Sequence, residues 1–172
     1  ITSVEALGSL VNLTQLVLSG NQITSVESLN KLVNLTGLFL ASNQITSVVS
    51  LVSMIKLSEL ILDGNQITYI EPLGELITLT KLHLNGTQIT SFNSLGRLVN
   101  LTLLGLSGNN ITSGDLITMA EQLKEMPHLV TLFLNGNQIT SIEALSGLVG
   151  LTKLWLNDNQ ITSIEELREL VH

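Results

Sequence analysis

The sequence has no cysteine among its 172 residues, and it is poor in aromatic and charged side chains. The absence of cysteine excludes disulfides, thiol catalysis and zinc sites with cysteine ligands. It also fits a bacterial or cytosolic protein better than an animal extracellular receptor, because extracellular proteins commonly carry disulfides.

Basic residues are also scarce. Seven Lys and Arg stand against fourteen Asp and Glu, which gives a formal net charge of -7, and there is no basic run. Charge-driven binding of nucleic acid or of anionic lipid is therefore not expected. No apolar run approaches the roughly 20 residues of a membrane span, so membrane insertion is not expected, and no secretory signal is visible.

Hydrophobic residues make up 44% of the chain, and they recur in a fixed frame, Leu-x-x-Leu-x-Leu-x-x-Asn-x-Ile. The first leucine of the frame recurs every 22 residues, except for one interval of 28 residues; it stands at Leu13, Leu35, Leu57, Leu79, Leu101, Leu129 and Leu151. This frame is typical of leucine-rich repeats, whose neighbours stack to build one continuous core.

The repeats predict an α/β solenoid, a right-handed leucine-rich-repeat horseshoe. We expect a parallel β-sheet on the concave side and short 3-10 or helical segments on the convex side. The whole chain is interpreted as one array, with a partial repeat at 1–12 and full repeats at 13–34, 35–56, 57–78, 79–100, 101–128, 129–150 and 151–172. Because residue 1 falls inside a repeat, we expect a fragment of a longer protein, with self-association through uncapped ends possible.

The asparagine of the frame has a structural explanation. Its amide has both donors and an acceptor, so it can satisfy the backbone groups of adjacent turns where water is absent. Thr87 replaces this asparagine in one repeat, and a hydroxyl can supply only part of the bonding. We therefore expect that loop to be weaker by about 1 kcal/mol.

The 28-residue repeat contains an insertion of helical character. Apolar residues follow at helical spacing after Asp115 and stop at Pro127. Asp115 is expected to be the N-cap, and residues 116–126 are expected to form a true α-helix.

The residue between the two leucines of Leu-x-Leu is predicted to face away from the core, because side chains alternate along a strand. In the seven frames this row reads Val17, Phe39, Ile61, His83, Gly105, Phe133 and Trp155. At about 4.8 Å per strand the row is roughly 29 Å long, and it holds three of the five aromatic residues. Its flanking positions are mostly polar.

An apolar row with polar margins predicts a protein-binding surface. The alternative is that these residues are strand formers that stack on one another. The predicted partner-binding residues are Val17, Phe39, Ile61, His83, Leu103, Phe133, Trp155, Glu59, Asp63, Lys81 and Lys153. We expect no cofactor and no metal, since His83 has no companion ligands, and we discern no catalytic constellation.

The frame Leu13-Thr14-Gln15-Leu16-Val17-Leu18-Ser19-Gly20-Asn21-Gln22-Ile23 resembles the repeats of bacterial internalins. It also resembles those of the leucine-rich regulatory subunit of protein phosphatase 1, while the insertion at 113–128 resembles a ribonuclease-inhibitor-type repeat. The first two resemblances imply a protein partner on the concave face, contacted by Phe39, Phe133 and Trp155.

The leading hypothesis is a protein-binding module of a bacterial surface or secreted protein, without enzymatic activity. An intracellular, cytoplasmic regulator that binds an enzyme such as a phosphatase is the second hypothesis. A structural spacer is the third.

Overall fold

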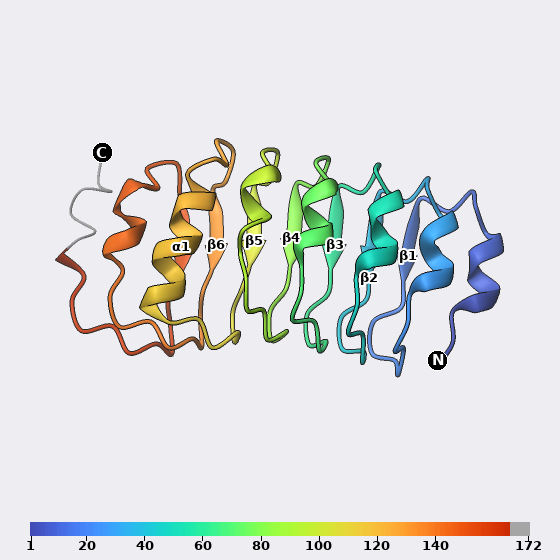
Figure 1. The fold of residues 1–172 in the computed structure, drawn as a ribbon, viewed down its shortest axis with the longest axis horizontal. Helices are drawn as coiled ribbons and strands as arrows, with labels where there is room; N and C mark the ends of the chain where they lie inside the picture. Colours follow the sequence, from blue (N-terminus) through green and yellow to red (C-terminus); the bar gives the residue numbers. More distant parts are fainter. Residues whose placement is uncertain (166–172) are drawn as a thin grey trace.

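A computed structural model describes residues 1–165 of the chain. The last predicted repeat, 151–172, extends beyond the described residues, so its final segment and its end at His172 lie outside them. Figure 1 shows the strands side by side in chain order, with the short helices packed over one face of the sheet.

Seven short strands form one open parallel sheet in the order β1 to β7. Each strand has three residues and pairs with the next at a spacing of one whole repeat, for example Leu38 with Leu60. The strands are Gln15–Val17 (β1), Gly37–Phe39 (β2), Glu59–Ile61 (β3), Lys81–His83 (β4), Leu103–Gly105 (β5), Thr131–Phe133 (β6) and Lys153–Trp155 (β7). This confirms the predicted leucine-rich-repeat fold with a parallel sheet.

The return segments are mostly 3-10 helices. Their i to i+3 hydrogen bonds, such as Leu29 N to Val26 O at 3.0 Å, suit segments too short for a regular α-helix. They are Glu5–Ser9 (η1), Glu27–Lys31 (η2), Val49–Ser53 (η3), Glu71–Glu75 (η4), Leu95–Arg97 (η5) and Glu143–Gly147 (η6). The core lies between these helices and the sheet and is continuous along the array.

Buried asparagines link each loop to the loop before it. Asn43 Nδ2 donates to Leu40 O at 2.9 Å and to Leu18 O at 3.0 Å, while its Oδ1 accepts from Ile23 N at 3.0 Å. Equivalent bonds recur at Asn65, Asn137 and Asn159. The predicted role of this column is confirmed, and we call it the asparagine ladder.

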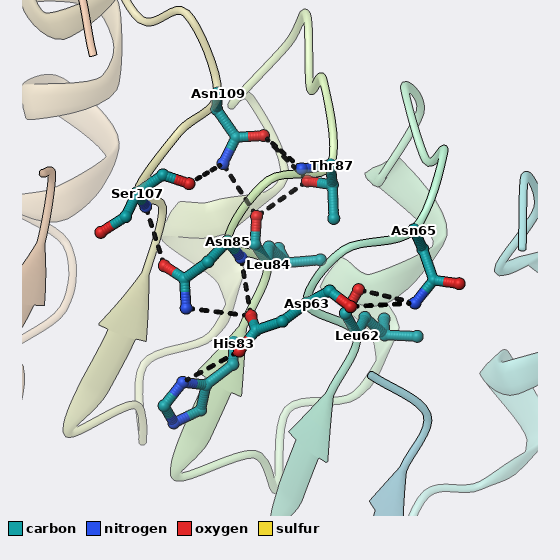
Figure 2. Close-up of polar contacts among 9 residues, drawn as sticks. All are labelled: Leu62, Asp63, Asn65, His83, Leu84, Asn85, Thr87, Ser107 and Asn109. Atoms are coloured by element: carbon teal, nitrogen blue, oxygen red, sulfur yellow. Dashed lines mark hydrogen bonds and ion pairs between the residues drawn. The ribbon is translucent and has the colours of Figure 1, made fainter. Parts of the chain in front are cut away.

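Thr87 interrupts the asparagine ladder. Its single hydroxyl proton faces two acceptors, Leu84 O at 2.8 Å and Asn109 Oδ1 at 2.9 Å, and can bond to only one at a time (Figure 2). Within residues 1–165 the buried N–H of Ile67 has no acceptor, although the equivalent Ile45 N–H bonds to Asn65. Gln88 adopts a φ of 84° and donates its N–H to Asn109 Oδ1 instead of to the preceding loop.

The helix of the long repeat, α1, spans Ser113–Leu123 and not residues 116–126. The prediction that Asp115 is the N-cap is wrong, because Thr112 occupies the N-cap position. Thr112 Oγ1 accepts from Asp115 N at 3.3 Å, and Asp115 Oδ2 accepts from Thr112 N at 2.9 Å, so the two residues form a capping box. After Leu123 the chain changes to i to i+3 hydrogen bonds, Glu125 N to Gln122 O at 3.2 Å and Met126 N to Leu123 O at 3.1 Å, and Pro127 disfavours a helical conformation for Met126.

The asparagine ladder makes a stability prediction at Asn65. We expect Asn65→Ala to lower the free energy of unfolding by about 3 kcal/mol, because it leaves Ile45 N–H and Leu62 C=O buried without a partner. Urea denaturation followed by circular dichroism measures this, with the exposed neighbour Gln66 changed to Ala as the control. Equal midpoints for the two variants would contradict a stabilising role for the ladder.

The opposite change is expected at the interruption. Thr87→Asn can restore an acceptor for Ile67 N–H and a second amide donor, so we expect it to raise the free energy of unfolding by about 1 kcal/mol. The same denaturation measurement applies, and Thr46→Asn on an exposed loop position is the matched control, with a change within about 0.5 kcal/mol. A Thr87→Asn protein that is no more stable than the parent would show that the loop has found other compensation.

Candidate functional site

The candidate site is the face of the sheet that points away from the core. The middle residue of the central strands, such as Leu60 or Leu82, is fully buried, so its two neighbours in the strand point outward. The pairing register puts seven of these neighbours side by side in one row, which we call the central row: Val17, Phe39, Ile61, His83, Gly105, Phe133 and Trp155. We call this surface the outer sheet face.

Three rings of the central row lie next to one another, which we call the ring stack: Phe133 and Trp155 are stacked, and His83 is tilted against Phe133. Phe133 and Trp155 lie 4.3 Å apart between ring centroids at an interplanar angle of 23°, and His83 lies 6.4 Å from Phe133 at 31°. An aromatic pair at such a distance contributes about 0.5–1.5 kcal/mol beyond its buried area. The rings are half-buried, so the stack both supports itself and presents an apolar surface to solvent.

Gly105 allows this stack to form. His83 and Phe133 belong to strands β4 and β6, and Gly105 lies between them on β5. A Cβ atom on Gly105 would lie 2.9 Å from Asn85 Nδ2 and 3.0 Å from Asn85 Oδ1. A larger residue at this position would therefore displace the side chain of Asn85.

Asn85 is held by its neighbours at the carboxyl end of the strands (Figure 2). Its Nδ2 donates to Asp63 Oδ1 at 2.9 Å, its backbone N donates to the same oxygen at 2.7 Å, and its Oδ1 accepts from Ser107 N at 2.8 Å. The second oxygen of Asp63 lies 3.9 Å from His83 Nδ1. We call Asp63, Asn85 and Ser107 the polar margin. Most of the polar groups named here already form hydrogen bonds within the protein.

The opposite margin carries Glu59, Lys81 and Lys153. Lys81 Nζ lies 3.5 Å from Glu59 Oε1 on the adjacent strand, and such a surface pair contributes at most about 1 kcal/mol. Leu103 is half-buried, while Thr131 is buried. Lys153 on β7 is exposed, and within residues 1–165 it has no ion pair.

The other end of the central row is built differently. Val17 is 69% exposed, and Phe39 and Ile61 are half-buried. A Cβ on Gly37 would lie 3.0 Å from Phe39 Cε2, so the ring of Phe39 lies over its own strand. Phe39 is thus separate from the stack of His83, Phe133 and Trp155, although sequence reasoning treats it as equivalent to Phe133.

Across residues 1–165, no group of three or more His, Cys, Asp or Glu side chains could hold a metal ion. None of the helices described there has the length and apolar character needed to cross a bilayer.

Sequence reasoning did not anticipate two parts of the site. Gly105 reads as a gap in the apolar row, whereas the structure uses it to bring two rings together. The hydrogen bonds of Asn85 to both neighbouring strands were not predicted either. The available signal was a run of short polar residues at one repeat position, Asp63, Asn85 and Ser107, next to a row position that lacks a side chain.

Two family models match the sequence, described as "Leucine rich repeat" over residues 11–67 and "Leucine Rich repeats (2 copies)" over residues 127–169. A search of curated proteins gives no significant match.

The solved structures that resemble the chain include two internalins of Listeria monocytogenes. Internalin InlF is 32% identical at a TM-score of 0.89, and the match covers 99% of this chain and 49% of InlF. Internalin C2 is 31% identical at a TM-score of 0.70, with 95% of this chain and 80% of that protein covered. The chain thus spans about half the length of InlF.

A plant protein is also similar. The leucine-rich-repeat ectodomain of the receptor kinase GASSHO1/SCHENGEN3 from Arabidopsis thaliana is 26% identical at a TM-score of 0.80, and the match covers 98% of this chain and 21% of that ectodomain chain. That ectodomain was solved in complex with CASPARIAN STRIP INTEGRITY FACTOR 2.

The geometry around Gly105 makes a prediction. We expect Gly105→Ala to lower the free energy of unfolding by about 1 kcal/mol, since the loss of the Asn85 hydrogen bonds outweighs the gain from replacing a strand glycine. Chemical denaturation measures the change, and the emission of Trp155 reports disturbance of the ring stack. Gly150→Ala is the control, because its Cβ would come no closer than 3.6 Å to Leu129 O. A Gly105→Ala protein as stable as the control would contradict the prediction, because it would show that the side chain of Asn85 can move aside without a loss of stability.

Proposed function

Because the chain belongs to the leucine-rich repeat family, we propose that it binds a protein partner on its outer sheet face. The observation that carries the proposal is the half-exposed stack of His83, Phe133 and Trp155. Aromatic residues dominate the energetic centres of protein interfaces, because they bury a large area with few rotatable bonds. The leucine-rich-repeat fold itself is a protein interaction module.

The surroundings of the stack support the same function. Val17, Phe39 and Ile61 extend the apolar surface along the sheet, and Lys81 and Glu59 border it. An apolar centre with a polar rim is the usual composition of a protein interface, since the rim tolerates water while the centre excludes it. On this proposal the binding residues are those of the central row other than Gly105, together with Glu59, Asp63, Lys81, Leu103 and Lys153.

The biological setting that we propose is a bacterial surface or secreted protein that recognises a cell-surface protein and has no catalytic activity of its own. The similarity to internalins InlF and C2 supports this setting, as does the lack of cysteine. The gene tests this setting: an upstream segment that encodes a secretory signal favours a surface or secreted protein, and its absence favours an intracellular regulator of an enzyme such as a phosphatase.

A structural spacer is the competing function, and one observation favours it. Phe133 and Trp155 stack directly on each other, so part of their apolar area is already buried without a partner. A spacer needs no accessible surface, whereas a binding module loses its partner when the accessible rings are removed. The two functions therefore differ in their response to substitution of the rings.

The test replaces three aromatic residues of the central row, Phe39, Phe133 and Trp155, with Ser. We expect the parent chain to capture a partner from a cell-surface protein fraction and the variant to lose at least 90% of that capture, because hot-spot aromatics contribute about 2 kcal/mol or more each. Quantitative mass spectrometry of the captured protein gives the measurement, and circular dichroism checks the fold of both proteins.

The control replaces three exposed aliphatic residues away from the sheet, Val49, Ile55 and Ile77, with Ser. This variant has the same number of apolar-to-Ser changes and is expected to retain capture. If the ring variant is folded and captures the partner as well as the parent does, binding by the outer sheet face is ruled out.

A further inference from the structure

We propose that the outer sheet face recognises an extended acidic segment of its partner, in which a carboxylate bonds to Lys153 and an apolar side chain two residues away packs on Phe133 and Trp155. This inference rests on the proposed function and specifies the chemistry of the partner. It follows from which polar groups of the face are already bonded and which are free.

Asp63 Oδ1 and the side-chain amide of Asn85 offer little hydrogen bonding to a ligand. Asp63 Oδ1 accepts two hydrogen bonds from Asn85, and the side-chain amide of Asn85 is bonded at both its nitrogen and its oxygen. A partner that bonds here must first break bonds within the fold, and each break leaves a group to be satisfied again. Asn135 Oδ1, at the same repeat position after β6, is buried without a hydrogen-bond partner among residues 1–165, but an amide oxygen accepts hydrogen bonds and cannot bind a carboxylate. A carboxylate of the partner is therefore expected to bind on the opposite margin, where the lysines lie.

On that opposite margin, Lys153 is the available charge. Glu59 lies 3.5 Å from Lys81 and largely cancels its charge, whereas Lys153 is exposed and has no ion pair among residues 1–165. The strands between them contribute Leu103 and Thr131, which are neutral. The end of the face at β6 and β7 therefore presents a local positive charge, and a carboxylate is its complement.

The spacing of this charge from the rings defines the ligand. Lys153 and Trp155 are two residues apart on β7, so both point outward and lie about 7 Å apart along the strand. Phe133 lies beside Trp155 and widens the apolar surface. An extended segment has the same two-residue repeat, so an acid-x-apolar sequence can contact Lys153 and the rings at once.

The experiment selects ligands without knowledge of the natural partner. A display library of random 12-residue peptides is panned on the intact chain, and peptides that also bind the variant with Phe39, Phe133 and Trp155 changed to Ser are removed. We expect the remaining peptides to be enriched in Asp or Glu two positions from an aromatic or aliphatic residue. A selection that yields no peptides, or a consensus that is neutral or basic, overturns the inference.

The selected peptide is then titrated against charge variants, with Trp155, the single tryptophan of the chain, as the fluorescent reporter. We expect Lys153→Ala to weaken binding about threefold and Lys153→Glu to weaken it about tenfold or more, with the difference shrinking as salt rises. Lys56→Glu is the control, because Lys56 is exposed, lies off the sheet and bonds to Asn34. Its affinity should equal that of the parent.

The outcomes separate the inference from the proposed function. If peptide binding depends on Phe133 and Trp155 but is the same in the parent and in Lys153→Glu, the acidic specificity is wrong and the binding face stands. If natural capture also survives substitution of the rings, the proposed function fails as well.

Discussion

The structure depends on one constraint: no repeat can bury its own leucines or satisfy its own loop. Each asparagine of the ladder bonds to the loop of its own repeat and to that of the preceding repeat, as Asn43 does with Leu40 and Leu18. These bonds are buried, so a mismatch between repeats would leave backbone groups without partners in the core. The ladder and the leucine core together hold neighbouring repeats in one position, and this position sets the register of the strands. Thr87 shows the consequence of a shorter side chain, because one buried N–H loses its acceptor and the next residue, Gln88, takes a positive φ.

Because the strand register is fixed, the position of a residue within its repeat determines its place on the outer sheet face. Because each strand pairs with the next at the same frame position, side chains 22 or 28 residues apart become neighbours on the outer sheet face. The face is therefore an extended surface whose residues come from every repeat. Gly105 has no side chain, so the rings of His83 on β4 and Phe133 on β6 approach each other across the strand between them. The surface thus depends on the missing side chain as well as on those that are present.

Much of the fold could be predicted because the repeat period follows from the leucines that each repeat must bury in the core. The repeats, the strand positions, the outward row, the asparagine bonds and the Glu59–Lys81 pair all follow from spacing. The helix boundaries could not be placed as well, since Thr112 and Asp115 are both acceptable caps and only their reciprocal bonds decide between them. The orientation of the rings could not be predicted either. In the sequence Phe39 and Phe133 hold equivalent positions, but in the structure Phe39 lies over Gly37 and Phe133 stacks on Trp155. Such differences arise from side-chain packing between strands, which the repeat period does not specify.

The stack of rings bears directly on how a partner would be bound. Association must repay the freedom lost by side chains that become ordered at the interface, about 0.5–1.5 kcal/mol for each mobile side chain. Rings that already pack against each other have lost most of that freedom in the unbound protein, as have the half-buried side chains beside them. Self-stacking and binding are therefore compatible, because the contacts between Phe133 and Trp155 hold the rings in place for a partner. The same rigidity limits which partners fit, since a surface built on strands of three residues in a fixed register has little room to adapt.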